Sequence, residues 1–309
     1  MSTEASTPAD DEFRFLASDA ARVGRTGPLP QVARVAVPVG DGRALSGLAF
    51  EPGTPPRLVA LHGAGLNAHS FDPMLLALDA PAVALDLPGH GRSDWRADAD
   101  YRPDHLADDI VTALETLAPE PVVLLGHSLG GLTAALAAAA RPELVRALVI
   151  VDITPGVSPQ GDAGAIAEFI SGQRDFGSIA EIVERAIAFG IGSDREALTR
   201  GVALNTRHRP DGRLEWTHHF AHLDGLSPAS DDPHPYAQIW ASLQTLEAPP
   251  ILIRASHGMV DAALAAEWAE QLPASRIETL TGPHNLHEAA PRELAAALAQ
   301  IIPGAAGSA

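Results

Sequence analysis

The sequence predicts an α/β protein built on a mostly parallel β-sheet, with a helical block inserted before its last strands. Three observations support this fold class. Short apolar runs typical of buried strands, such as "RLVALHG" and "VVLLGHS", alternate with helix-like segments. A hairpin-like pair of runs precedes them, and the strand pattern returns near the C-terminus after a block with helical periodicity only. This alternation favours parallel pairing in a sheet that is covered on both faces.

The strand-like and helix-like runs follow one another in a clear order. "VARVAVPV" and "ALSGLAF" flank "GDG" and predict an antiparallel hairpin, and four further strand-like runs end with "ALVIVDI". The clearest helix is "HLADDIVTALETLA", whose apolar face consists of Leu106, Ile110, Leu114 and Leu117. "PPILIRAS" and "RIETLTG" complete the sheet. We divide the chain into an N-terminal segment (1–30), a first core part (31–153), a helical insertion (154–246) and a second core part (247–309).

Composition narrows the possible partners. The 309 residues carry 21 basic and 39 acidic side chains, a formal net charge of −18, and no cysteine. This charge disfavours nucleic acid and anionic membranes as partners, and the sequence carries no signal for an oligomeric state. The lack of cysteine excludes thiolate metal sites and a cysteine nucleophile. We find neither a secretory signal nor a membrane-spanning run and expect a cytoplasmic protein.

Ser128 is the candidate nucleophile. It lies in "GHSLGG", where a strand-like run changes abruptly into an alanine-rich helix. This G-x-S-x-G pattern is typical of a strained turn that exposes the serine, with Gly126 and Gly130 where the backbones approach closely. The helix N-terminus and the Leu129 amide would lie where a negative oxygen forms. The alternative is a tight turn with a serine N-cap.

His284 is the candidate base. A serine hydroxyl needs a base to remove its proton, and His284 follows the last strand-like run in "GPHNLH". Loops at the ends of parallel strands commonly carry reactive groups. His287 is the alternative; its other role would be to cap or pack the last helix.

Four motifs in this order resemble the α/β-hydrolase fold family over nearly the whole chain: "LHGAGLNAHSF", "LDLPGHGRSD", "GHSLGG" and "GPHNLH". The resemblance implies an eight-stranded, mostly parallel sheet flanked by helices, with the insertion as a cap. It also implies an oxyanion hole formed by the backbone N–H groups of Ala64 and Leu129. The side chains that belong to the same motifs are expected to hold loops together; they are His62, Asp86, His90 and Arg92.

The carboxylate that would accept a hydrogen bond from His284 departs in its position from the family pattern. The turn after the seventh strand reads "RASHGMVD", with Gly258 and Met259 where the carboxylate is expected. Asp261 follows, but it is also a natural N-cap for the next helix. Asp152 ends the sixth strand on the same sheet edge as Ser128, and a subset of esterases in the family takes its acid from that strand. We predict Asp152 as the acid, with Asp261 as the alternative; Asp152 could instead only brace the entry to the cap.

The family resemblance and Ser128 together imply a serine hydrolase without a cofactor. Its substrate would be small to medium and mostly apolar, cleaved at an ester, thioester, lactone or C–C bond next to a carbonyl. The alternative is a catalytically silent ligand receptor or scaffold, which the missing acid after the seventh strand favours. His218 and His222 have i, i+4 spacing but lack a third ligand, so we predict no metal site. Trp216, Phe220 and Trp240 are candidate pocket walls, although core packing explains them equally well.

Overall fold

An eight-stranded sheet forms the centre of the computed structural model, which describes residues 12–158, 164–223 and 236–302. The strand order is β1-β2-β4-β3-β5-β6-β10-β11. β2 pairs antiparallel with β1 and β4, and the other neighbours pair parallel. The strands are β1 (Val32–Pro38), β2 (Ala44–Phe50), β3 (Leu58–Leu61), β4 (Ala82–Leu85), β5 (Val122–His127), β6 (Val145–Val151), β10 (Ile251–His257) and β11 (Arg276–Pro283). The predicted sheet with an antiparallel edge is confirmed.

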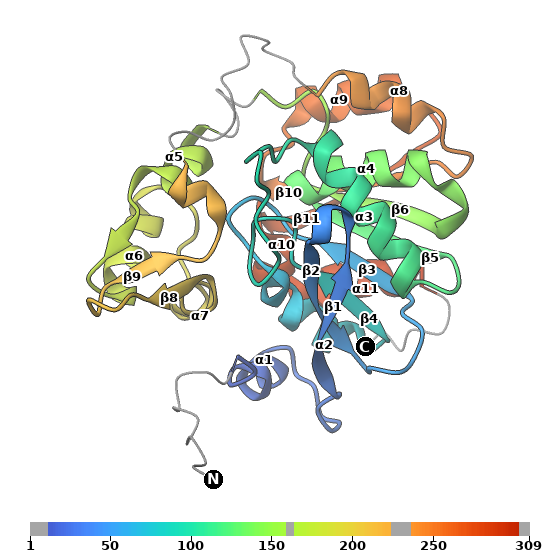
Figure 1. Cartoon of the computed structure of the whole chain (residues 1–309). Coiled ribbons are helices and arrows are strands. Elements are labelled where there is room, and N and C mark those ends of the chain that lie inside the picture. The colour runs from blue at the N-terminus through green and yellow to red at the C-terminus, as the bar shows by residue number, and fades with distance from the viewer. Residues whose placement is uncertain (1–11, 159–163, 224–235, 303–309) are drawn as a thin grey trace.

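Helices cover both faces of this sheet (Figure 1). One layer contains α3 (Pro103–Leu117), α4 (Leu129–Ala140), α8 (Gln238–Gln244) and α9 (Ala262–Gln271). The other contains α1 (Leu16–Arg22), α2 (Asp72–Leu78), α10 (Leu286–Ala289) and α11 (Pro291–Ala299). Alternate strand residues point to opposite faces, so Leu124 of β5 joins the first core and Leu125 joins the second. Short 3-10 turns lie at Gly40–Gly42, Ala68–Phe71, Pro142–Leu144 and His219–His222.

The insertion contains a small sheet as well as helices. Its described elements are α5 (Gly164–Gly172), β7 (Asp175–Phe176), α6 (Ile179–Ala188), α7 (Arg195–Asn205), β8 (Thr206–His208) and β9 (Leu214–Trp216). The three strands pair antiparallel in the order β7-β9-β8, in a lobe to the left of the main sheet in Figure 1. The expectation of helices alone was therefore wrong here, because strands of two or three residues are too short to show alternation. α8 was also expected in the insertion, yet it packs against α4 of the core.

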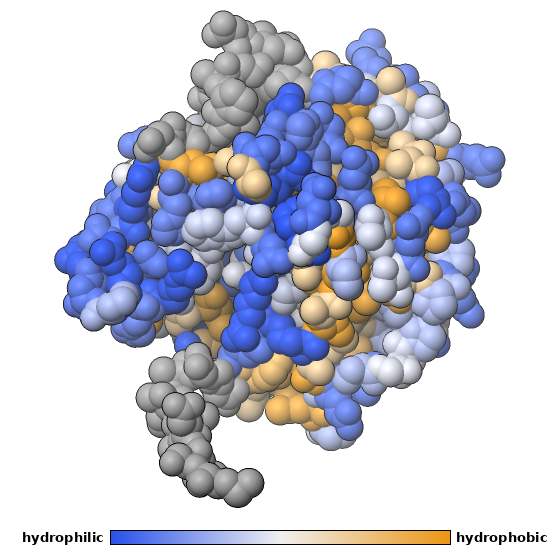
Figure 2. Space-filling model, in the orientation of Figure 1, coloured by the Kyte–Doolittle hydropathy of each residue, from blue (hydrophilic) through white to orange (hydrophobic). Residues whose placement is uncertain are grey.

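Hydrophobic side chains are largely confined to the interior. Among the described residues, Leu29 and Trp95 are the large hydrophobic side chains that are exposed. On the face drawn in Figure 2, hydrophilic residues cover most of the insertion, and hydrophobic residues form separate patches. In the part of the chain described, each helix is too short or too polar to cross a membrane.

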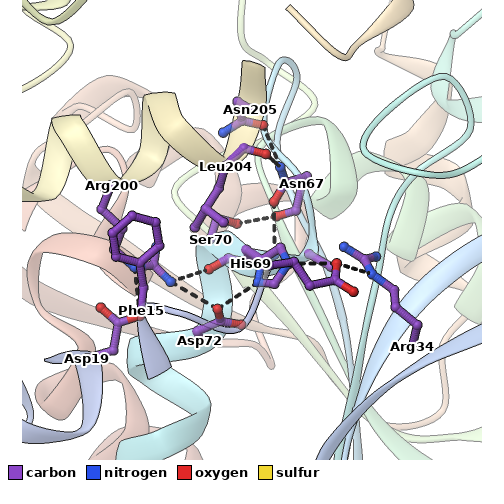
Figure 3. A network of polar contacts seen from close by, with 12 residues as sticks. Phe15, Asp19, Arg34, Asn67, His69, Ser70, Asp72, Arg200, Leu204 and Asn205 are labelled. Atoms are coloured by element: carbon purple, nitrogen blue, oxygen red, sulfur yellow. Dashed lines mark hydrogen bonds and ion pairs between the residues drawn. The ribbon is translucent and has the colours of Figure 1, made fainter. Parts of the chain in front are cut away.

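A buried polar network holds α7 of the insertion against the core (Figure 3). The Arg200 guanidinium lies 2.7 Å from a carboxylate oxygen of Asp19 on α1 and 3.0 Å from one of Asp72 on α2. It also donates to the carbonyl of His69 at 3.0 Å. Only 6% of Arg200 is exposed, and the two aspartates are also buried. Because a buried charge without its partner is costly, these pairs fix α7 to both α1 and α2.

Candidate active site

Ser128 lies at the turn between β5 and α4, at the carboxyl ends of the parallel strands. Its φ and ψ angles are 53° and −124°, a backbone conformation that is strained for any residue with a side chain. The flanking glycines make the turn possible. A Cβ on Gly126 would lie 2.3 Å from the Gly130 carbonyl oxygen, and one on Gly130 would lie 2.3 Å from that of Leu61. The structure therefore has Ser128 in the predicted strand-turn-helix corner.

Two backbone N–H groups flank this corner. Ala64 lies in the loop after β3, and Leu129 is the first residue of α4. The Gly130 N–H donates to the His62 carbonyl at 3.1 Å and so joins the two segments. Within the described residues, neither the Ala64 N–H nor the Leu129 N–H donates a hydrogen bond to the protein. Both can therefore donate to a negative oxygen on a bound molecule.

His62 and Asp86 hold the surrounding loops together. His62 Nδ1–H donates to the Gly63 carbonyl at 2.7 Å, and its Nε2 accepts the Leu87 N–H at 3.0 Å. Burial lowers the pKa of His62 to about 4, so this ring is neutral at neutral pH. Asp86 accepts the Ala68 N–H at 2.8 Å. These contacts connect the loop that carries Ala64 with the loop after β4.

His90 and Arg92 make similar local contacts. His90 is buried, and its Nδ1–H donates to the Pro88 carbonyl at 3.0 Å. Burial lowers the pKa of His90 to about 3, so it too is neutral at neutral pH. The Arg92 N–H donates to Asp86 at 3.1 Å, and its guanidinium lies 3.3 Å from Glu12. Both residues thus support the loop after β4.

Asp152 and His284 form a hydrogen-bonded pair. The distance between Asp152 Oδ2 and His284 Nδ1 is 2.7 Å. Asp152 follows β6, is fully buried, and also accepts the N–H groups of Ala255 and Met259 at 2.8 and 2.7 Å. A carboxylate acceptor requires the proton on Nδ1, which leaves His284 Nε2 as an acceptor. The pair therefore fixes the tautomer that a general base needs.

Gly258 explains how Asp152 reaches this position. β6 and β10 are adjacent parallel strands, with Val151 paired to Ile253, so the turn after β10 closes over the end of β6. A Cβ on Gly258 would lie 2.0 Å from Asp152 Oδ2. The Asp152 carboxylate thus occupies the space that a side chain from this turn would enter. Asp261 instead caps α9, where its Oδ1 accepts the Leu264 N–H at 2.9 Å.

Two buried histidines pack beside His284. His127 Nε2–H donates to the His284 carbonyl at 3.1 Å and so anchors the loop after β11 to β5. The ring of His287 lies 4.8 Å from that of Phe71 and 4.5 Å from that of His127, between centroids. Neither nitrogen of His287 has a hydrogen-bond partner in the described part of the chain, and burial lowers its pKa to about 3. The hydrogen bond to Asp152 belongs to His284, and His287 packs in the interior.

Ser128 and His284 both line one pocket of about 250 Å³. The loop around Ala64 lines it on the core side, and apolar residues such as Phe169 and Ile170 line it from the insertion. The hydrogen bonds of the described residues do not include one between Ser128 Oγ and His284 Nε2. Such bonds are often long in the absence of a substrate. The pocket can accept a mostly apolar molecule beside both side chains.

The remaining candidates from the sequence lie elsewhere. His218 Nδ1 accepts a backbone N–H of the 3-10 turn that follows it, and His222 Nε2–H donates to the Trp216 carbonyl at 3.2 Å. Over the described ranges, no group of three or more His, Cys, Asp or Glu side chains could hold a metal ion. Trp216 lines a second cavity and, like Phe220 and Trp240, belongs to the hydrophobic core.

Sequence reasoning missed the role of Asn67. Its Nδ2 donates to the Leu204 carbonyl at 2.7 Å and to Asn205 Oδ1 at 2.8 Å, while its Oδ1 accepts the His69 N–H at 3.0 Å (Figure 3). Asn67 thus connects the end of the loop that carries Ala64 to the C-terminal end of α7. An asparagine directly before a short turn was an available capping signal. Its partners on α7 had no signal in the sequence.

This sheet order, the serine after β5 and the histidine after β11 together define the hydrolase class of α/β proteins. A family model described as the alpha/beta hydrolase fold matches residues 56–185. Esterase Rv0045c of Mycobacterium tuberculosis is 37% identical over 257 residues, which cover 81% of this chain and 81% of that protein. A solved structure of this esterase has a TM-score of 0.80 at 35% identity and covers 94% of this chain and 98% of its own.

A second relative matches over a shorter span. 2-(acetamidomethylene)succinate hydrolase of Mesorhizobium japonicum is 37% identical over 112 residues, or 36% of this chain and 40% of that protein. The structure of an E-2-(acetamidomethylene)succinate hydrolase has a TM-score of 0.74 at 23% identity, covers 88% of this chain and 99% of its own, and shares the fold. The chain belongs to the α/β-hydrolase fold family and is a hydrolase.

Proposed function

We propose that this protein is a serine hydrolase that cleaves an ester of a small to medium, mostly apolar molecule. The observation that carries the proposal is the hydrogen bond of 2.7 Å between His284 and Asp152, beside a pocket that also contains Ser128. The 37% identical relative from M. tuberculosis is an esterase. This relative favours an ester over the thioester, lactone and C–C bonds that the same chemistry can cleave.

In the first half of the reaction, Ser128 Oγ attacks the carbonyl carbon of the ester while His284 Nε2 takes the serine proton. Asp152 stabilises the imidazolium that results, and the N–H groups of Ala255 and Met259 hold the carboxylate in place. The former carbonyl oxygen becomes negative. The N–H groups of Ala64 and Leu129 would donate to it, and the N-terminus of α4 favours the same charge.

In the second half, the tetrahedral intermediate collapses and His284 returns the proton to the departing alcohol. This collapse breaks the bond to the alcohol and leaves the acyl group as an ester on Ser128 Oγ. Water enters, His284 removes its proton, and a second oxyanion forms at the same two N–H groups. This second intermediate collapses when the bond between the acyl carbon and Ser128 Oγ breaks, and His284 returns its proton to Oγ as the carboxylic acid leaves. No step needs a cofactor.

The alternative of a silent binding protein depended on the missing acid after β10. Asp152 occupies that space, and it has a hydrogen bond to His284. A binding protein has no need of a buried carboxylate that fixes the tautomer of an adjacent histidine. We therefore keep the enzymatic proposal alone.

The test measures hydrolysis of p-nitrophenyl acetate and butyrate and labelling by a fluorophosphonate. We expect the wild type to show both, and Ser128→Ala to show neither while remaining folded by circular dichroism. Ser242→Ala on α8 is the matched control and should behave as the wild type. A folded wild type without turnover and without labelling would refute the proposal.

A further inference from the structure

A second cavity of about 250 Å³ adjoins the active-site pocket, between the insertion and the core. The two spaces share part of their walls, including Leu66, Phe169 and Ile170. Leu66 lies in the same loop as Ala64, so the second cavity begins beside the segment expected to bind the oxyanion. We call this space the α7 cavity.

One face of α7 lines the α7 cavity. The lining residues are Ala197, Leu198, Gly201, Val202 and Asn205, whose spacing places them on one side of a helix. Phe169 and Trp216 add aromatic surface. The walls are therefore mainly apolar, and they are held in place because the buried Arg200 pairs and Asn67 fix α7 to the core.

Polar side chains mark another part of the wall. Arg22 lies 3.6 Å from Asp194 and donates to the Glu288 carbonyl at 3.1 Å. Arg22 and Asp194 are partly exposed, so this part of the wall meets solvent. Glu288 also lines the cavity, and burial raises the pKa of its carboxyl.

Gly201 keeps the α7 cavity open. Glycine weakens the interior of a helix relative to alanine. Packing does not require a glycine here, because the nearest atom to a Cβ at this position would be Glu288 Oε1, at 3.6 Å. A longer side chain would project into the cavity.

We propose that the α7 cavity binds one apolar arm of the ester, so that the preferred substrates are esters with a medium-length hydrocarbon chain. This inference rests on the proposed esterase function. Each methylene that leaves water for an apolar wall should raise kcat/KM by about fourfold, until the cavity is full.

The test compares Gly201→Leu with Gly201→Ala. Both substitutions remove the glycine from α7, but only leucine fills the cavity. Two substrate series are measured: p-nitrophenyl esters from acetate to octanoate, and acetate esters of alcohols of the same lengths. We expect the wild type and Gly201→Ala to prefer the longer chain in one series. In Gly201→Leu, kcat/KM for the longer chain should fall at least about tenfold more than kcat/KM for acetate with a short alcohol.

Two results would overturn the inference. One is an unchanged chain-length preference in Gly201→Leu in both series; the other is an equal loss on short and long esters. If Gly201→Leu does not fold, Ala197→Leu, one turn earlier on the same face, replaces it. Failure of the proposed function itself has a different signature, because the wild type would then cleave no ester and bind no fluorophosphonate.

Discussion

Asp152→Asn tests the assignment of the acid most directly. The carboxylate has two oxygens, and each has its own donors in the structure. Oδ2 accepts from Met259 N–H and His284 Nδ1–H, whereas Oδ1 accepts from Ala255 N–H and, at 3.4 Å, from Val260 N–H. An asparagine has one acceptor oxygen. In either orientation its NH₂ group must therefore face a buried N–H group.

These contacts indicate how far Asp152→Asn should change the stability of the fold and the turnover of the enzyme. One buried donor without its acceptor costs about 1–3 kcal/mol, which is less than the 5–15 kcal/mol by which domains are usually stable. The fold should therefore survive. The reaction suffers more, because the negative charge beside the imidazolium is lost and the NH₂ group can favour the wrong tautomer of His284. In a serine-protease triad the same change lowers kcat about ten-thousand-fold, or by about 5 kcal/mol of transition-state stabilisation.

The assay is kcat for p-nitrophenyl acetate, with unfolding in urea measured on the same samples. Asp261→Asn is the matched control, because asparagine caps a helix as well as aspartate does and Asp261 caps α9. We expect normal kcat in the control and a fall of three to four powers of ten in Asp152→Asn. Near-normal turnover in Asp152→Asn, with the loss in Asp261→Asn instead, would refute the reasoning.

Three further outcomes are expected. Asp152→Ala combined with Gly258→Asp should recover about ten- to hundredfold of the kcat lost in Asp152→Ala alone, because a side chain at 258 enters the vacated space; no recovery would contradict this. Arg200→Met should lower the free energy of unfolding in urea by about 3–5 kcal/mol, since two buried carboxylates lose their partner, whereas the exposed Arg207→Met should change it little. His287→Leu should make the free energy of unfolding less sensitive to acid. The pKa of His287 is about 3 when folded and about 6.5 when unfolded, so its contribution to stability is lost as the pH falls from 6.5 towards 3. Between pH 7 and pH 5 the variant should lose about 2 kcal/mol less unfolding free energy than the wild type, and equal losses would argue against a buried neutral ring.

The sheet was predictable because its strands carry strong local signals. The hairpin, the apolar run before Ser128 and the two strands after the insertion each have a pattern that neighbouring residues produce. The small sheet of the insertion has no such pattern. Its hairpin turns around Gly212, whose φ is 82°, and "PDG" was the one available signal.

The sequence favoured Asp152 over Asp261 only through the family resemblance, because no local pattern separates the two. Asp152 and Asp261 both follow strands that end at the same edge of the sheet. The choice depends on how the turn after β10 closes over β6, and this three-dimensional arrangement involves residues about a hundred positions apart. Gly258 was visible as a missing acid, but the sequence did not reveal that its lack of a Cβ makes room for Asp152.

The contact between the insertion and the core was equally hidden. Arg200 meets Asp19 and Asp72, which lie 181 and 128 positions away along the chain. Neither hydrophobic periodicity nor a short motif can predict an ion pair between residues so far apart in the sequence.

The pairing of Arg200 with Asp19 also bears on how much of the chain is needed for a working enzyme. The family model begins at residue 56, and a protein shortened to start at β1 would retain the whole sheet and every proposed catalytic residue. It would nevertheless lose α1, which supplies one of the two carboxylates that hold α7 and also Arg22 at the wall of the α7 cavity. Removal of the N-terminal residues would then loosen α7, a wall of the proposed substrate site that lies far away along the sequence. A protein that starts at β1 is therefore expected to keep its catalytic residues but to differ from the full chain in the esters that it prefers.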